Sequence, residues 1–160
     1  WGLESTSSAA GYMYPSQWLT ENFKHSIRDL KNTVTMDSYD SAMAQLASGQ
    51  IDVMPEYADA RMDDATKWTT TFGAKESIWD DTNVIGVTPA IANDGIMVSE
   101  KSKIMTADFK KALSAAIKDM AKTDEGKKVI AIYSHDGYVD STKADYKTAI
   151  KVANSMSKAN

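Results

Sequence analysis

The chain has 160 residues, of which 42% are hydrophobic and 25% charged, and its formal net charge is -4. This length fits one compact domain or two small lobes that share a core, and the composition excludes collagen-like, low-complexity and mostly disordered chains. The lack of cysteine excludes disulfides, thiolate metal sites and a cysteine nucleophile, and the acidic charge argues against a nucleic-acid partner.

The first half of the chain predicts a strand, a helix and a second strand in succession. The β-branched segment Thr33–Met36 predicts a strand, and Ser38 is placed to cap the following helix, which ends at Gly49. A second strand is predicted at Ile51–Met54. Because a strand, a helix and a strand joined by short turns are typical of a parallel sheet, we expect an α/β fold.

The second half predicts two further strands and three helices. The pattern weakens between 56 and 81, where 58–68 favours a helix and 69–73 a turn. Buried strands are predicted at Asn83–Val87 and Gly95–Ser99. Helices are predicted from Thr106, over about 125–133, and from about Ser141, the last with Tyr146, Ala149, Ile150 and Ala153 on one face.

Charge is divided unevenly along the chain. Residues 1–90 hold 6 Lys and Arg against 13 Asp and Glu, whereas residues 91–160 hold 12 against 9. This shift predicts a change of lobe near residue 90. The sequence begins at Trp1 with neither an initiator methionine nor a secretory signal, which indicates a processed product or a fragment.

Ser5, Thr6, Ser7 and Ser8 form a hydroxyl-rich loop in front of a helix predicted from about Tyr12. Hydroxyl donors and the amide groups of a first helical turn can together replace the hydration of a phosphate-like anion. The loop therefore predicts an anion site. The alternative is an ordinary serine-rich loop that caps a helix.

Three other side chains are predicted to lie near that loop. Asp59 and Asp94 follow predicted strands, and the ends of parallel strands are where α/β folds bind ligands. An ionised Asp can accept a proton from a P–OH group or pair with an amine of the ligand; a solvated loop Asp is the alternative for each. Tyr39 follows the strand at Thr33–Met36 and can offer a phenolic hydrogen bond to the same cleft.

An acidic cluster supports a competing, enzymatic hypothesis. Asp59, Asp63 and Asp64 could supply hard oxygen ligands to a metal ion in a phosphohydrolase, although a charged helix surface is the simpler interpretation. No nucleophile elbow, Walker loop or dinucleotide fingerprint occurs in the sequence. We therefore predict no catalytic residue, no metal ligand and no cofactor.

Five motifs resemble the phosphonate, phosphite and phosphate-binding proteins of ABC transporters, and their order and spacing match over nearly the whole chain. The family has the periplasmic-binding-protein type II fold, in which two α/β lobes hold the ligand between them. The resemblance implies that residues 1–92 form the second lobe with the anion-binding loop. Residues 93–160 would be a crossover strand and C-terminal helices of the first lobe, whose N-terminal part is absent. The motifs are Ser5–Ser8 with Gly11, Tyr12 and Pro15, then Leu46–Val53, Thr88–Ile96, Thr123–Lys127 and Ile132–Tyr138.

The resemblance also implies roles for the candidate residues. The hydroxyls of Ser5–Ser7 would hold the phosphoryl oxygens, Asp94 would accept from a P–OH group, and Asp59 could meet an amino group. Tyr39 stands where many relatives have a histidine, which leaves phosphite, methylphosphonate, phosphate and aminoalkylphosphonates all open as ligands.

The resemblance further implies a non-catalytic receptor outside the cytoplasm, in the periplasm or at the outer face of the cell membrane. Its partners would be a small phosphorus oxyanion, an ABC permease and the missing N-terminal lobe segment. Any membrane association would come from a lipid anchor outside this sequence. The alternative within this fold is another phosphorylated solute.

Overall fold

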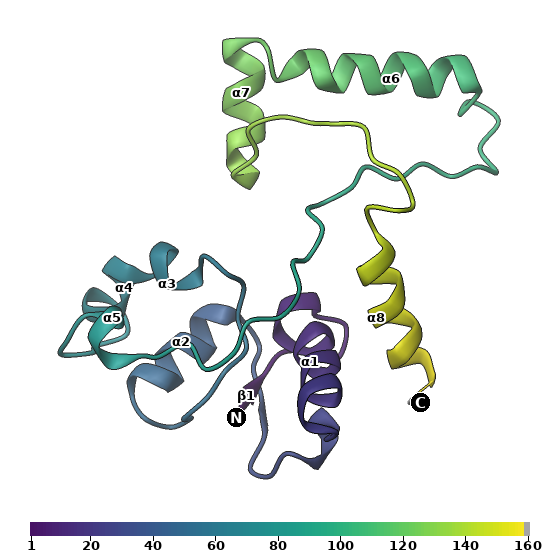
Figure 1. Cartoon of the computed structure of the whole chain (residues 1–160). Helices are drawn as coiled ribbons and strands as arrows, with labels where there is room; N and C mark the ends of the chain where they lie inside the picture. Colours follow the sequence, from purple (N-terminus) through teal and green to yellow (C-terminus); the bar gives the residue numbers. More distant parts are fainter. Residues whose placement is uncertain (159–160) are drawn as a thin grey trace. The chain divides into compact units, whose positions relative to one another are not determined.

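The computed structural model describes residues 1–158, which divide into two compact units. Unit 1 consists of residues 1–92 and the C-terminal segment from Tyr146, and unit 2 consists of residues 93–145. Unit 1 contains the strands and most of the helices, whereas unit 2 contains α6 and α7 (Figure 1).

A pair of short parallel strands lies at the start of unit 1. β1 (Gly2–Leu3) pairs with β2 (Val34–Thr35), with Gly2 opposite Val34 and Leu3 opposite Thr35. The strand predicted at Thr33–Met36 is thus confirmed. Its partner β1 was not predicted, because two residues are too few for an alternating pattern.

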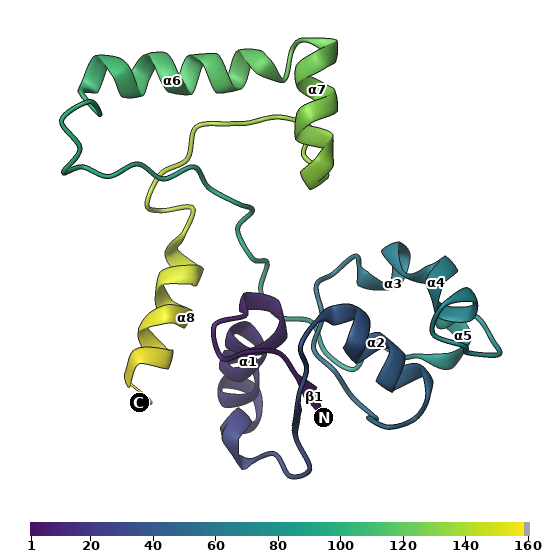
Figure 2. The same ribbon diagram turned by 180° about the vertical axis from the view of Figure 1, so that it is seen from behind.

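The segment between these strands is helical. A π-helical turn, η1 (Ala9–Met13), leads into α1 (Tyr14–Phe23), and a 3₁₀ turn, η2 (Ile27–Asp29), follows. α1 lies beside β1 in both views of the ribbon (Figure 1 and Figure 2). Leu3, Leu19 and Ile27 form a small core where these elements meet.

α2 (Tyr39–Ala47) has the capping residues that the sequence indicates. The Ser38 hydroxyl oxygen accepts a hydrogen bond from the Ser41 amide at 3.1 Å. Gly49 then adopts φ +72°, a left-handed conformation that ends the helix and that glycine tolerates best. The predicted helix from Ser38 to Gly49 is confirmed.

Three short helices follow in unit 1: α3 (Ala60–Asp63), α4 (Ala65–Thr70) and α5 (Ile78–Asp81). Their buried faces pack on α2 around Met43, Ala60, Trp68 and Ile78. The helix predicted over 58–68 is therefore present but interrupted at Asp64, and it continues into the segment 69–73 that was predicted as a turn.

Three predicted strands do not form within the described residues. In Ile51–Met54, the Val53 carbonyl accepts a hydrogen bond from the Gly2 amide at 2.8 Å, but the segment forms no strand. Asn83–Val87 and Gly95–Ser99 form no regular structure and have no ladder partner among residues 1–158. A strand needs a neighbour to bond its backbone, and local sequence pattern cannot supply one.

Unit 2 is built from α6 (Ala107–Met120), α7 (Asp124–Ile130) and a 3₁₀ turn, η3 (Ala131–Tyr133). Thr106 and Thr123 cap α6 and α7 by accepting hydrogen bonds from the amides of Phe109 and Gly126. The helices predicted from Thr106 and over 125–133 are confirmed.

The last helix, α8 (Lys147–Lys158), belongs to unit 1 and packs on α1 and η1. It begins later than the predicted Ser141, because Thr142 and Asp145 close a turn before it. Its buried face is centred on Val152, which is 2% exposed, whereas Ile150 and Ala153 are exposed. The predicted face is thus only partly correct: Tyr146 and Ala149 are half-buried, but the buried face is rotated toward Val152. Among the described residues no helix is long and apolar enough to cross a membrane.

Candidate functional site

The hydroxyl-rich loop starts where β1 ends, so its position follows from the strand pairing. Two backbone hydrogen bonds close the loop, from Glu4 N–H to the Gly11 carbonyl at 3.3 Å and from Ser8 N–H to the Ser5 carbonyl at 2.8 Å. The hydroxyls of Ser5 and Ser7 lie 3.0 Å apart, and both residues are exposed. The loop is therefore a closed turn that presents polar side chains at the carboxyl end of a parallel strand.

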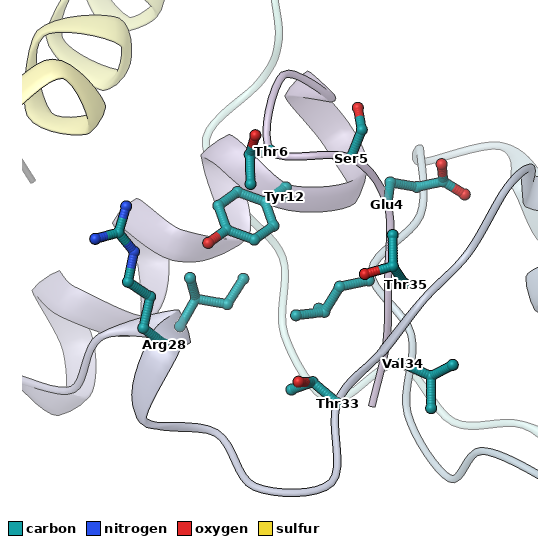
Figure 3. Close-up of a pocket in the computed structure, with 10 residues that line it drawn as sticks. Glu4, Ser5, Thr6, Tyr12, Arg28, Thr33, Val34 and Thr35 are labelled. Atoms are coloured by element: carbon teal, nitrogen blue, oxygen red, sulfur yellow. The ribbon is translucent and has the colours of Figure 1, made fainter. Parts of the chain in front are cut away.

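A pocket of about 360 Å³ lies beside this loop (Figure 3). Ser5 and Thr6 line it from the loop, Tyr12 from η1 and Arg28 from η2. The remaining lining residues are Leu3, Glu4, Ile27, Thr33, Val34 and Thr35. Hydroxyl groups and a guanidinium therefore face a space of the size that small-molecule sites have, roughly 300–1,000 Å³.

Ser8 has a local role at the start of η1. Its hydroxyl oxygen accepts a hydrogen bond from the Gly11 amide at 3.1 Å, as a helix cap does. The same hydroxyl lies 3.1 Å from the phenol of Tyr39. The structure thus brings Tyr39 to the loop through Ser8, and a contact of either side chain with a ligand stays a prediction.

Two glutamates lie near Tyr39 in a poorly solvated environment. Both carboxylate oxygens of Glu56, and Oε1 of Glu4, are shielded from solvent and form no hydrogen bond of standard geometry with any described residue. Burial raises the pKa of Glu56 to about 8, and the charges of Glu4, Asp64 and Asp40 add to the rise. Burial likewise raises the pKa of Glu4, helped by Asp37.

The same environment affects the phenol of Tyr39. Burial raises its pKa, the hydrogen bond with Ser8 opposes that rise, and the charges of Glu56 and Glu4 add to it. The phenol therefore stays neutral at physiological pH, and it can donate a hydrogen bond to an anion.

Asp59 and Asp94 are not brought to the loop by any contact between described residues. Asp59 is exposed at the start of α3, where its side chain forms no cap. Asp94 belongs to unit 2, and its carboxylate lies 3.7 Å from Nε2 of His135. Their approach to the loop stays a prediction.

The acidic cluster is not assembled into a metal site. Asp63 accepts a hydrogen bond from the Tyr57 phenol at 2.9 Å, and Asp64 pairs with Lys67 at 3.0 Å. Among residues 1–158 no group of three or more His, Asp or Glu side chains could hold a metal ion. Asp63 and Asp64 therefore each bind a neighbouring side chain.

Several pocket residues were missed by the sequence analysis. Arg28 and Tyr12 lie on turns whose side-chain directions depend on tertiary packing. Thr33 and Thr35 were assigned only to a strand. The Ser26–Asp29 spacing, a serine followed three residues later by an acid, is a helix-start signal that could have identified the turn that positions Arg28.

A polar pocket at the carboxyl end of a parallel strand is the kind of site that ligand-binding α/β proteins carry. The family model described as "ABC transporter, phosphonate, periplasmic substrate-binding protein" matches residues 1–146. The chain therefore belongs to this family of solute-binding transport components, which confirms the resemblance found in the sequence. Comparison with curated proteins and with solved structures found no match.

Proposed function

We propose that this protein is the extracytoplasmic solute-binding component of an ABC importer and that it binds a small phosphorus oxyanion, a phosphonate, phosphite or phosphate. The family match over residues 1–146 supports the transport role. The observation that supports the oxyanion is the position of Ser5 and Thr6, which line a 360 Å³ pocket directly after β1.

The chemistry of the pocket suits such an anion. Ser5, Thr6 and Tyr12 each carry a hydroxyl that can donate a hydrogen bond to a phosphoryl oxygen. The guanidinium of Arg28 adds positive charge within the same pocket. Ser7, Ser8 and Tyr39 would complete the donor set from the rim of the loop.

The proposal places the ligand between two lobes of a type II periplasmic-binding fold. Residues 1–92 would form one lobe, on which α8 packs. Residues 93–145 would join an N-terminal segment outside this sequence to form the other, so the sequence-based boundary of 93–160 is revised at α8. Asp59 and Asp94 would then approach the ligand on closure. Closure around the solute would create the surface that an ABC permease recognises.

The exposed apolar segments support a missing strand partner. Val84, Ile85 and Val87 are 62%, 68% and 76% exposed, and Met97 is 92% exposed. Apolar segments without ladder partners are stabilised when they pair with further strands. The N-terminal segment of the other lobe would provide those strands.

Titration calorimetry of the full-length protein with methylphosphonate, phosphite and phosphate tests this function. We expect at least one of these anions to bind, and we expect Ser5→Ala with Thr6→Ala to weaken it. A hydrogen bond to a charged group contributes about 1.5–3 kcal/mol, so the double substitution should reduce affinity by ~100-fold or more.

Thr70→Ala is the matched control, because this exposed hydroxyl donates to the Thr66 carbonyl within α4 and does not line the pocket. It should leave affinity unchanged. Full affinity in the Ser5 and Thr6 double variant would remove the loop from the site, and no binding of any phosphorus oxyanion would refute the function.

A further inference from the structure

The pocket beside the loop has a cationic end as well as a hydroxyl end. Figure 3 shows Ser5 and Arg28 well separated among the labelled lining residues, with the ring of Tyr12 drawn between them and its hydroxyl directed toward the Arg28 side. All three residues line the pocket. A ligand held by Ser5 and Thr6 therefore has a second, positively charged group within the same cavity.

Arg28 is held in place by the turn that carries it. The Ser26 hydroxyl accepts a hydrogen bond from the Arg28 amide at 3.1 Å, and the Asp29 carboxylate accepts one from the Ser26 amide at 2.8 Å. Ile27, which is 2% exposed, anchors the turn in the core with Leu3 and Leu19. The backbone of Arg28 is thus fixed on both sides, so its side chain leaves a defined point on the pocket wall.

The pocket is larger than an inorganic oxyanion requires. Phosphate has five non-hydrogen atoms, whereas a volume of 360 Å³ falls within the range of pockets that hold whole organic ligands. Leu3 and Ile27 contribute apolar side chains to the lining, which suits a carbon chain. The space favours a phosphonate with an organic substituent over phosphate or phosphite.

Together these features favour a substituent that carries a negative charge. We propose that Arg28 binds a carboxylate at the far end of the ligand, so that the solute is a phosphonocarboxylate with two anionic ends. This inference rests on the proposed function, because it takes Ser5 and Thr6 as the phosphoryl site. Guanidinium and carboxylate match in a planar, two-bond geometry, and the hydroxyls of Tyr12 and Thr33 line the same pocket.

The charged residues that line the pocket favour an anionic tail over a cationic one. Among the described residues that line the pocket, Arg28 and Glu4 are the charged ones. Figure 3 shows the Glu4 carboxylate on the side away from Arg28. Burial and the nearby Asp37 raise the pKa of Glu4, which disfavours its negative charge. An ammonium tail beside Arg28 would instead be repelled.

Calorimetry of the full-length protein with phosphonoacetate, methylphosphonate and 2-aminoethylphosphonate tests the inference. Phosphonoacetate should bind most tightly. Arg28→Gln should weaken phosphonoacetate by about 10- to 100-fold and methylphosphonate much less, because only the former has a carboxylate to lose. Arg28→Lys should fall between Arg28→Gln and the unaltered protein, since lysine keeps the charge and loses the two-bond geometry.

Lys31→Gln is the matched control, because Lys31 is an exposed cation three residues away that does not line the pocket. It should preserve the ratio of the two affinities, and circular dichroism should show that all variants fold. An equal loss for both ligands in Arg28→Gln, or tighter binding of 2-aminoethylphosphonate than of phosphonoacetate, would overturn the carboxylate assignment and leave the proposed function standing. If no phosphorus oxyanion binds, the proposed function fails as well, and if the Ser5 and Thr6 variant binds normally, the phosphoryl site on which this inference rests is refuted.

Discussion

The two units differ in how they bury apolar side chains. Unit 1 contains two clusters of buried residues, one around Trp68 and Ile78 and one around Leu3 and Ile27. Within residues 93–145, Ile130 is the hydrophobic side chain that is buried. The amphipathic helix α6, Ala107–Met120, has no buried residue.

This difference shows that a helix can form locally without burying its apolar face in a core. Phe109, Val129 and Ile132 are 45%, 53% and 77% exposed, although the helices predicted from Thr106 and over 125–133 form and are capped. Caps and helical propensity can define a helix, but burial of an apolar face supplies most of its stability in a protein. Unit 1 has that burial and carries the pocket, whereas unit 2 has helices whose apolar faces lack a core.

The largest expected effect comes from matched isoleucines in the two units. Ile78 is 1% exposed in the core of unit 1, and Ile132 is 77% exposed in unit 2. Ile78→Ala should lower the free energy of unfolding by about 2–5 kcal/mol, because it leaves a cavity. Ile132→Ala should change it by less than ~0.5 kcal/mol. Urea denaturation of the 160-residue chain measures both values.

Equal effects of these two substitutions would abolish the contrast between the units. If Ile132→Ala greatly lowered the free energy of unfolding of the full-length protein but not of the 160-residue chain, the contrast would be sharpened instead. That result would mean that another segment covers unit 2, as the proposed N-terminal lobe segment would.

A smaller effect is expected from the buried carboxyl group in unit 1. The pKa of Glu56 is raised from an ordinary value of 4.5 to about 8, so the folded state binds its proton more tightly than the unfolded state does. The free energy of unfolding should therefore fall as pH rises from about 4.5 to 8, and level off above 8. Because the side chain is partly screened by solvent, we expect the loss to be about 2 kcal/mol.

Glu56→Gln isolates this effect, since glutamine imitates the protonated carboxyl at every pH. Its stability relative to the unaltered protein should increase between pH 5 and 8. Glu76→Gln provides the control, because Glu76 is exposed. Parallel pH profiles for the unaltered protein and Glu56→Gln would show that Glu56 is ionised normally and that its surroundings are solvated.

The comparison of units also explains what could be predicted from the sequence. The cap at Ser38, the helices from Thr106 and over 125–133, and the strand around Val34 depend on residues close in the chain, and all were predicted. The strands at Asn83–Val87 and Gly95–Ser99 were wrong, since a strand requires a bonded neighbour that local pattern does not reveal.

The candidate site likewise contains residues that the local sequence reveals and residues that only the packing reveals. The loop at Ser5–Ser8 could be recognised as a local cluster of hydroxyls. Arg28 could not, because it reaches the pocket only through the packing of Ile27 against β1 and α1. The raised pKa of Glu56 likewise arises from burial and from carboxylates distant in sequence.

The smallest expected effect comes from removing a helix cap. Its consequences should differ between a helix that packs on a core and a helix that does not. Thr106 and Ser38 cap α6 and α2 with hydrogen bonds of 3.2 and 3.1 Å. Replacement of either by alanine should cost about 1 kcal/mol, and Thr106→Ser should restore the lost stability. Since α6 has no buried residue and α2 buries Ala42 and Met43, the same loss should have different consequences. Hydrogen exchange should accelerate throughout α6 in Thr106→Ala, but only in the first turn of α2 in Ser38→Ala. Acceleration throughout both helices would mean that burial does not hold α2 in place.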